Sequence, residues 1–141
     1  MRWLLDTSVL TTLGRTCTDP SVEKFIAAQP LDRLYVSSLM FAELRYNIDR
    51  LSDLLWRMEL DDWLAQKLRP MFDGRVLDIS EAVVLRWQSL AEDGARVGHM
   101  FFAPELIIAA TAVHHGLTIV TRDTKEYKLA GVPVINPWSD Q

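Results

Sequence analysis

Four carboxylates stand at places in the chain from which a fold could bring them together: Asp6, Glu43, Glu105 and Asp123. Asp6 and Asp123 each follow a short, mainly apolar run, and Glu43 and Glu105 come early in two helical segments. Carboxylates that converge repel one another unless a cation neutralises them. The pattern therefore predicts a Mg²⁺ or Mn²⁺ site, and with it the hydrolysis of a phosphodiester.

Short apolar strands alternate with helical segments, and this alternation predicts an α/β fold with a mainly parallel sheet. In such a sheet, ligands bind beyond the carboxyl ends of the strands. Asp6 and Asp123 lie just past the first and fourth candidate strands, so we expect both at this edge of the sheet. The five candidate strands are residues 2–5, 34–37, 75–79, 117–121 and 132–135.

Helix caps and apolar spacing predict the helices in the first half of the chain. Asp19 followed by Pro20 is typical of a helix start. A further helix, with apolar residues as far as Leu68, is expected to end before Pro70. Between these two, Ser37 or Ser38 can cap a helix whose apolar face carries Leu44, Ile48, Leu51 and Leu55.

Two more helices are expected in the second half. Ser80 can cap a helix that Gly94 and Gly98 then break. Pro104 begins a helix that is apolar almost all round, as helices buried against a sheet are, and Gly116 ends it in the left-handed conformation. The sequence shows no repeat, low-complexity tract or linker, so residues 1–141 are expected to form a single domain.

Charge and cysteine content narrow the function further. The formal net charge of −4 argues against a protein that holds nucleic acid by bulk electrostatics, so an RNA-directed chain needs local basic residues, a metal or a partner. The single Cys17 rules out an internal disulfide and a thiolate zinc site. No run reaches the roughly 18 apolar residues of a membrane span, and Asp6 interrupts any signal-peptide core. We therefore expect a cytoplasmic protein.

Each of the four acids also has an ordinary structural explanation. Asp6 could cap a helix that starts near Thr7, and Asp123 could be a turn residue. Glu105 could complement a helix dipole, and Glu43 could be a solvated helix residue. Only the joint placement of all four favours a site.

Several sequence blocks, taken together, resemble a PIN domain, most closely its VapC- and FitB-like toxin branch. The blocks are LLDTSVL at 4–10, VSS at 36–38 with AELR at 42–45, IAATA at 108–112, LTIVTRD at 117–123 and VINPW at 134–138. The resemblance implies a three-layer α/β fold with a five-stranded parallel sheet in the order 3-2-1-4-5, flanked by helices. It also implies a Mg²⁺- or Mn²⁺-dependent endoribonuclease that cuts structured RNA such as tRNA.

The same resemblance implies particular partners and supporting residues. The partner is a VapB-like antitoxin, through which alone the complex contacts DNA in autoregulation. A homodimer is expected, and Trp56 and Trp63, seven residues apart, could share its contact face. Three supporting positions match the family: hydroxyls near the metal at Thr7 and Thr121, and a basic side chain beside the helix-borne acid at Arg45.

The sequence departs from the family pattern around the third acid. The family usually reads Gly-Arg-Pro-x-Pro-x-x-Asp, whereas residues 98–105 here read GHMFFAPE. His99 therefore replaces the arginine, and Glu105 replaces the aspartate. Because glutamate is one methylene longer, we expect a metal site that is weakened and not abolished.

The expected roles follow from the chemistry of hard oxygen ligands. Asp6, Glu105 and Asp123 are expected to hold the metal, and Glu43 to be a further ligand or to orient the attacking water. Two alternatives stay open. One is a PIN-like module that binds an antitoxin and takes part in DNA-binding autoregulation without cutting. The other is a different metal-dependent phosphohydrolase on the same sheet.

Overall fold

The computed structural model describes residues 1–14 and 19–138, so Cys17 lies outside the described residues. Its sheet has five parallel strands in the order β3-β2-β1-β4-β5, which confirms the expected topology. Each strand lies within its predicted range. The strands are β1 (Trp3–Leu5), β2 (Leu34–Ser37), β3 (Val76–Leu77), β4 (Thr118–Val120) and β5 (Val134–Ile135).

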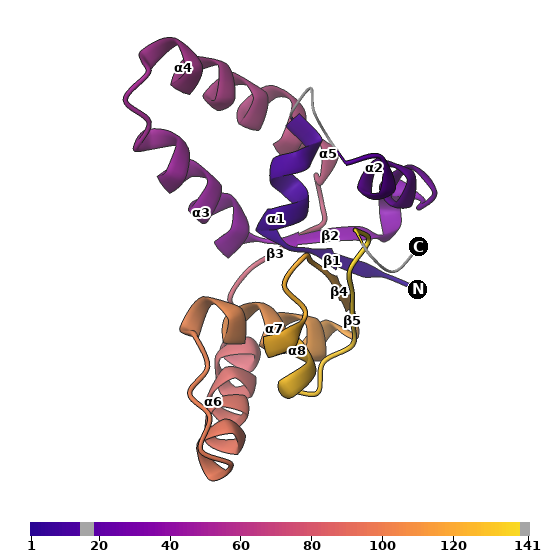
Figure 1. The fold of residues 1–141 in the computed structure, drawn as a ribbon, viewed down its shortest axis with the longest axis vertical. Helices are drawn as coiled ribbons and strands as arrows, with labels where there is room; N and C mark the ends of the chain where they lie inside the picture. The colour runs from indigo at the N-terminus through magenta and orange to yellow at the C-terminus, as the bar shows by residue number, and fades with distance from the viewer. Residues whose placement is uncertain (15–18, 139–141) are drawn as a thin grey trace.

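Helices cover both faces of the sheet, which gives the three expected layers (Figure 1). One face carries α1 (Thr7–Leu10), η1 (Thr11–Gly14), α2 (Pro20–Ala27), α3 (Ser38–Asp49), α4 (Leu54–Trp63), η3 (Leu64–Leu68) and α5 (Arg69–Met71). The other face carries α6 (Glu81–Arg96), α7 (Ala103–His115) and α8 (Lys125–Leu129). A 3-10 turn, η2 (Leu31–Arg33), leads into β2.

Helix α7 is the central helix of its layer, packed against both α6 and the sheet. Its middle, from Leu106 to Ala112, is largely buried, as the all-round apolar sequence predicted. Ala109 and Ala112 are among the buried residues, and such small side chains permit close packing against the buried Ile119 of β4. Among the described residues, no helix combines the length and the apolar character that crossing a membrane requires.

The local signals at the helix ends are confirmed. The side chains of Asp19, Ser37 and Ser80 each accept a backbone N–H in the first turn of the following helix, at 2.8, 3.1 and 3.3 Å. Gly116 adopts φ 68°, and the chain turns there from α7 towards β4. These caps fix where the helices begin and end relative to the carboxyl edge of the sheet.

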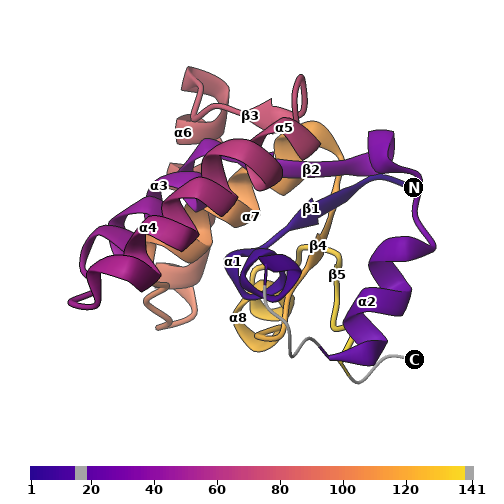
Figure 2. The ribbon, with the colours of Figure 1, turned by 90° about the horizontal axis from the view of Figure 1, so that it is seen from above.

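The helix expected to run through Leu55 is in fact two helices. Helix α3 ends at Asp49, and α4 starts anew where the Asp53 side chain accepts the Trp56 N–H at 3.1 Å. Asp53 supplies a second N-cap, and the chain turns back so that α4 lies alongside α3 (Figure 2). Leu55 is 74% exposed, so the spacing from Leu44 did not mark one buried face.

The helical chain also continues past Pro70, contrary to expectation. Residues Leu64–Leu68 form a π-helix, and α5 then includes Pro70. A proline inside a helix lacks the N–H of a regular turn, and its ring crowds the carbonyl four residues earlier. The wider π turns before Pro70 relieve this crowding. The helix therefore continues through the proline with a changed hydrogen-bond pattern.

Gly94 was expected to break its helix, but it lies inside α6. A Cβ atom built on Gly94 would lie 2.7 Å from the Phe101 ring and 3.0 Å from the His99 carbonyl oxygen. The His99 N–H also donates to the Gly94 carbonyl at 2.9 Å. The missing side chain at Gly94 lets the segment after the helix fold back and pack closely against it. The helix ends only near Gly98, which has φ 74°.

Gly94→Ala is therefore expected to lower the free energy of unfolding by about 1–3 kcal/mol, because the new methyl group overlaps the Phe101 ring. In an open helix position the same change raises stability by roughly 0.5–1 kcal/mol. Urea denaturation of the parent and the variant measures the difference.

The matched variants are Phe101→Ala and the double change. If the overlap is the cause, Gly94→Ala costs much less in the Phe101→Ala background than in the parent. A Gly94→Ala protein that is as stable as the parent would contradict the packing described here.

Candidate functional site

The four acids singled out in the sequence all line one open cavity of about 300 Å³. Asp6 and Asp123 follow β1 and β4 at the carboxyl edge of the sheet, Glu105 lies in the first turn of α7, and Glu43 lies in α3. The fold thus gathers side chains from four distant segments. The other residues that line the cavity are Thr7, Phe102, Pro104, Ile108 and Tyr127.

Asp6 is tied into the sheet and the first helix by its backbone. Its N–H donates to the Val120 carbonyl at 3.0 Å, and its own carbonyl accepts the N–H groups of Val9 and Leu10 at 3.0 and 3.1 Å. Its side chain makes no helix-capping hydrogen bond. One carboxylate oxygen instead accepts the Thr121 hydroxyl at 2.7 Å. Asp6 therefore occupies the N-cap position of α1, but its side chain is engaged with Thr121 and does not cap the helix.

The buried Thr121 hydroxyl links the two aspartate loops. While it donates to Asp6, it accepts the backbone N–H of Asp123 at 3.1 Å. The Ser8 hydroxyl lies 3.4 Å from it and accepts the Arg122 N–H at 3.2 Å. One buried side chain therefore fixes the position of one carboxylate and the backbone of the other. Ser8 had not been singled out in the sequence.

Glu43 is held from the helix that follows β1. The Thr7 hydroxyl donates to one of its carboxylate oxygens at 3.1 Å, and the residue is half-buried, so it is not a freely solvated helix residue. Arg45, on the same helix, does not line the acid cavity. Its side chain is 71% exposed and lies 4.0 Å from Asp49, beside a different hollow. The structure thus joins Thr7, but not Arg45, to the acids.

The cavity disfavours negative charge on the acids inside it. Burial raises the pKa of Asp6 above its ordinary value, and the neighbouring Asp123 raises it further. Burial likewise raises the pKa of Glu43, with Asp6 adding to the effect. The pKa of Glu105 is raised by burial and then by the charges of Asp123, Glu126 and Asp6. Together these acids concentrate negative charge in the cavity, and a bound cation would neutralise it.

Tyr127 is a residue of this site that the sequence reading missed. It lies in the short helix α8, is 2% exposed, and lines the cavity. Burial raises the pKa of its hydroxyl, and the charges of all four acids raise it further, so the hydroxyl stays protonated and can donate a hydrogen bond. No periodic pattern in the sequence marked Tyr127, because α8 is only 5 residues long.

The oxygen-rich lining suits a hard cation such as Mg²⁺. This ion keeps several waters and is usually held by one or two carboxylates together with substrate phosphates. Among residues 1–14 and 19–138, no three His, Cys, Asp or Glu side chains are close enough to hold one ion together. The donor chemistry therefore fits a hydrated ion on few ligands, not a closed cage. Joint coordination by Asp6, Glu105 and Asp123 stays a prediction.

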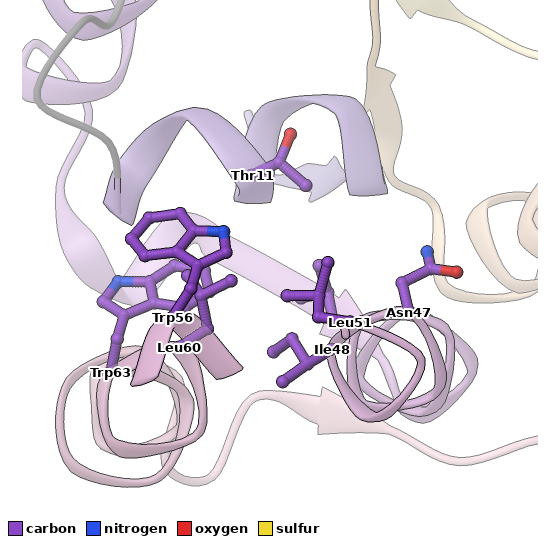
Figure 3. Close-up of a pocket in the computed structure, with 8 residues that line it drawn as sticks. Thr11, Asn47, Ile48, Leu51, Trp56, Leu60 and Trp63 are labelled. Atoms are coloured by element: carbon purple, nitrogen blue, oxygen red, sulfur yellow. The ribbon is translucent and has the colours of Figure 1, made fainter. Parts of the chain in front are cut away.

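A second, apolar cavity of about 220 Å³ lies between α3, α4 and η1 and shares no residue with the acid cavity. Figure 3 shows Trp56 and Trp63 on the same side of it, facing Ile48 and Leu51. Trp56 is 43% exposed. The two tryptophans thus share one face, as their spacing suggested. The remaining lining residues are Thr11, Leu44, Asn47 and Leu60.

Comparison with known proteins gives one consistent result. The PIN domain family model matches residues 3–132. The VapC ribonuclease Y4jK of Sinorhizobium fredii is 33% identical over 135 residues, 96% of each chain. Toxin FitB of Neisseria gonorrhoeae is 34% identical over 137 residues, 97% of this chain and 99% of FitB.

Solved structures agree with these sequence relatives. The crystal structure of FitAcB from Neisseria gonorrhoeae superposes with a TM-score of 0.92 at 33% identity, over 97% of this chain and 99% of that one. The structure of FitAB bound to an IR36 DNA fragment gives a TM-score of 0.92 at 30% identity, over 99% and 97%.

The raised pKa of Asp6 generates a stability prediction for the metal-free protein. Asp6→Asn is expected to raise the midpoint of thermal unfolding at pH 7 by about 3 °C, because the asparagine keeps the shape and removes the disfavoured charge. The sign follows from the pKa of Asp6. The loss of stability caused by its negative charge is absent well below the ordinary aspartate pKa of 3.8, and it is fully present above the raised pKa of the folded protein. Thermal unfolding followed by circular dichroism in EDTA measures the effect.

The gain should therefore vanish at about pH 3, where both proteins are neutral at residue 6. The exposed Asp78→Asn serves as the matched control and should change the midpoint little at either pH. A gain from Asp6→Asn that persists unchanged at low pH would count against charge as its cause.

Proposed function

The chain belongs to the PIN-domain family, in its VapC- and FitB-like branch, and on that basis we propose that it is a metal-dependent endoribonuclease, the toxin of a VapBC-like toxin–antitoxin pair. The observation that carries the proposal is the gathering of Asp6, Glu43, Glu105 and Asp123 around one cavity. The proposed substrate is structured RNA such as tRNA, and the proposed location is the cytoplasm.

The chain's own residues would share the work of phosphodiester hydrolysis. When bound, Mg²⁺ or Mn²⁺ would offset the negative charge and increase the acidity of a water molecule. Asp6 and Asp123, fixed through Thr121, provide the carboxylates at the strand ends that would hold the ion. Glu43, oriented by Thr7, would orient the attacking water and accept its proton, a role that a raised carboxyl pKa favours.

Glu105 would complete the site from the first turn of α7. Its carboxylate carries one methylene more than the aspartate that is usual in the family, so it must bend back or shift the ion. The charges of Asp123 and Asp6 act on it, which supports a place beside the ion. We propose that this substitution slows cleavage without abolishing it.

The proposed partner is a cognate VapB-like antitoxin. The similar FitAB structure was solved on a DNA fragment, which supports a complex that contacts DNA through its antitoxin. An antitoxin could neutralise the acid cavity with a basic side chain and cover the apolar cavity between α3 and α4 with apolar ones. A homodimer of the chain also remains part of the proposal.

The decisive experiment is incubation of the purified chain with total RNA or tRNA and Mg²⁺ or Mn²⁺. We expect cleavage that EDTA stops and that Asp6→Ala reduces at least about 100-fold, because the site loses a charged ligand. Glu105→Asp is expected to cleave about tenfold faster than the parent, because the shorter side chain restores the carboxylate position that is usual in the family. Equal cutting by the parent and Asp6→Ala would identify a contaminating nuclease and remove the support for the assignment.

Metal titration separates the proposal from its alternatives. A chain that binds no Mn²⁺ but still binds an antitoxin would be a non-catalytic PIN-like module, and the change to Glu105 is the feature that favours that second function. Hydrolysis of small phosphoesters in preference to RNA would instead indicate a different phosphohydrolase.

Trp56→Glu tests the apolar cavity as the antitoxin surface. Placing a charge among Ile48, Leu51 and Trp63 is expected to weaken antitoxin binding at least about 30-fold, while RNA cleavage by the isolated chain stays at the parent level. Calorimetric titration and the RNA assay measure the two effects. Leu85→Glu, a change at an exposed apolar residue of α6, is the matched control.

Sedimentation of the same variants shows whether the cavity instead belongs to the homodimer. If Trp56→Glu turns a dimeric chain into a monomer and leaves antitoxin binding unchanged, the cavity is a contact between protomers and its proposed use by the antitoxin is wrong.

A further inference from the structure

An exposed aromatic side chain stands at the rim of the acid cavity. Phe102 is 67% exposed, and it lines the cavity together with Glu105 and Asp123. A large apolar ring in water beside a group of acids contributes little to folding, since burial is what makes such a ring stabilising. Its position beside the acids therefore suggests a use in binding.

The backbone beneath this ring is fixed. Phe102 is the residue that precedes the first turn of α7, with φ −71° and ψ 129°, and its carbonyl accepts the Leu106 N–H at 3.1 Å. Helix α7 is in turn buried against the sheet and α6. The ring is thus presented from the start of a helix that packs against both α6 and the sheet.

The preceding residues of the same segment are also anchored. The Phe101 ring packs on Gly94, and its centroid lies 4.4 Å from that of the His99 ring at an angle of 77°. The His99 Nε2 atom lies 2.7 Å from a carboxylate oxygen of Glu126 in α8. Among the described residues no ring contact involves Phe102 itself. The segment is held on its inner side and leaves one aromatic face open.

Charge limits how RNA can be held here. The net charge is −4, and the cavity itself is acidic, so bulk electrostatic attraction does not draw RNA phosphates to this site. Stacking of a base on an aromatic ring needs no positive charge and accepts every base. Phe102 offers this kind of contact next to the carboxylates at which a scissile phosphate would be placed.

We propose that Phe102 stacks on the nucleobase next to the scissile phosphate, so that the site selects an unpaired nucleotide in a loop of a structured RNA. This inference rests on the proposed ribonuclease function and deepens it, because bases paired inside a helix have no free face to offer. The apolar cavity between α3 and α4 is separate from the acid cavity, so an antitoxin that covers the apolar cavity need not cover Phe102.

The test uses three variants: Phe102→Ala, Phe102→Leu and Phe102→Trp. On a hairpin RNA cut in its loop, the alanine and leucine variants are expected to raise KM about tenfold with little change in kcat. The tryptophan variant should restore the parent KM. Rescue by an aromatic ring, but not by leucine of similar apolar character, separates stacking from simple packing. The exposed Leu85→Ala on α6 is the matched control and should leave both constants unchanged.

A second measurement does not depend on cleavage. The chain with Asp6→Asn keeps the RNA intact, and a short single-stranded RNA with a central 2-aminopurine reports stacking through fluorescence quenching. Quenching is expected with Phe102 or Trp at position 102 and not with Ala or Leu. Quenching that survives Phe102→Ala overturns the proposal, as does a leucine variant that behaves like the parent.

The two measurements separate this proposal from the function on which it rests. A chain that cuts RNA with the same KM after Phe102→Ala would refute stacking and leave the nuclease in place. A chain that cuts no RNA but quenches 2-aminopurine through Phe102 would refute the nuclease and support stacking. If Phe102→Ala leaves KM and kcat for RNA unchanged but weakens antitoxin binding, the ring belongs to the antitoxin contact and the proposal is overturned.

Discussion

Mutual repulsion among carboxylates at one edge of the sheet is the constraint on which the rest of the structure depends. The pairing of β1 with β4 brings Asp6 and Asp123 to adjacent loops, and the Thr121 hydroxyl fixes both. Helices α3 and α7 then direct Glu43 and Glu105 at the same cavity. Folding must supply enough buried apolar surface elsewhere to hold these acids together without a counter-ion. The large core around β1, β4 and α7 meets that need.

Much of this architecture could be predicted from the sequence, because the signals involved are local. The caps at Asp19, Ser37 and Ser80 and the left-handed Gly116 were all visible as residue types beside an apolar pattern. Strand order came from family resemblance, since local spacing says nothing of which strands pair. Asp6 was expected at the carboxyl edge simply because it follows a strand, and position alone sufficed.

Some errors overlooked a local signal, and others depend on contacts between segments distant in the chain. Apolar spacing from Leu44 onwards suggested one helix, but the cap at Asp53 turns the chain back. Arg45 matched a family position, yet its side chain faces another hollow. Tyr127 joined the site from a helix too short to leave a periodic pattern, and it became visible only when α8 was seen beside α7.

The close fit between Gly94 and Phe101 has a consequence for how sequences of this kind can diverge. A side chain at position 94 would overlap the Phe101 ring, and Phe101 directly precedes Phe102 at the rim of the acid cavity. Substitutions at Gly94 and Phe101 are therefore expected to be coupled. A change at Gly94, which does not line the acid cavity, would therefore act on the segment that carries the Phe102 side of that cavity.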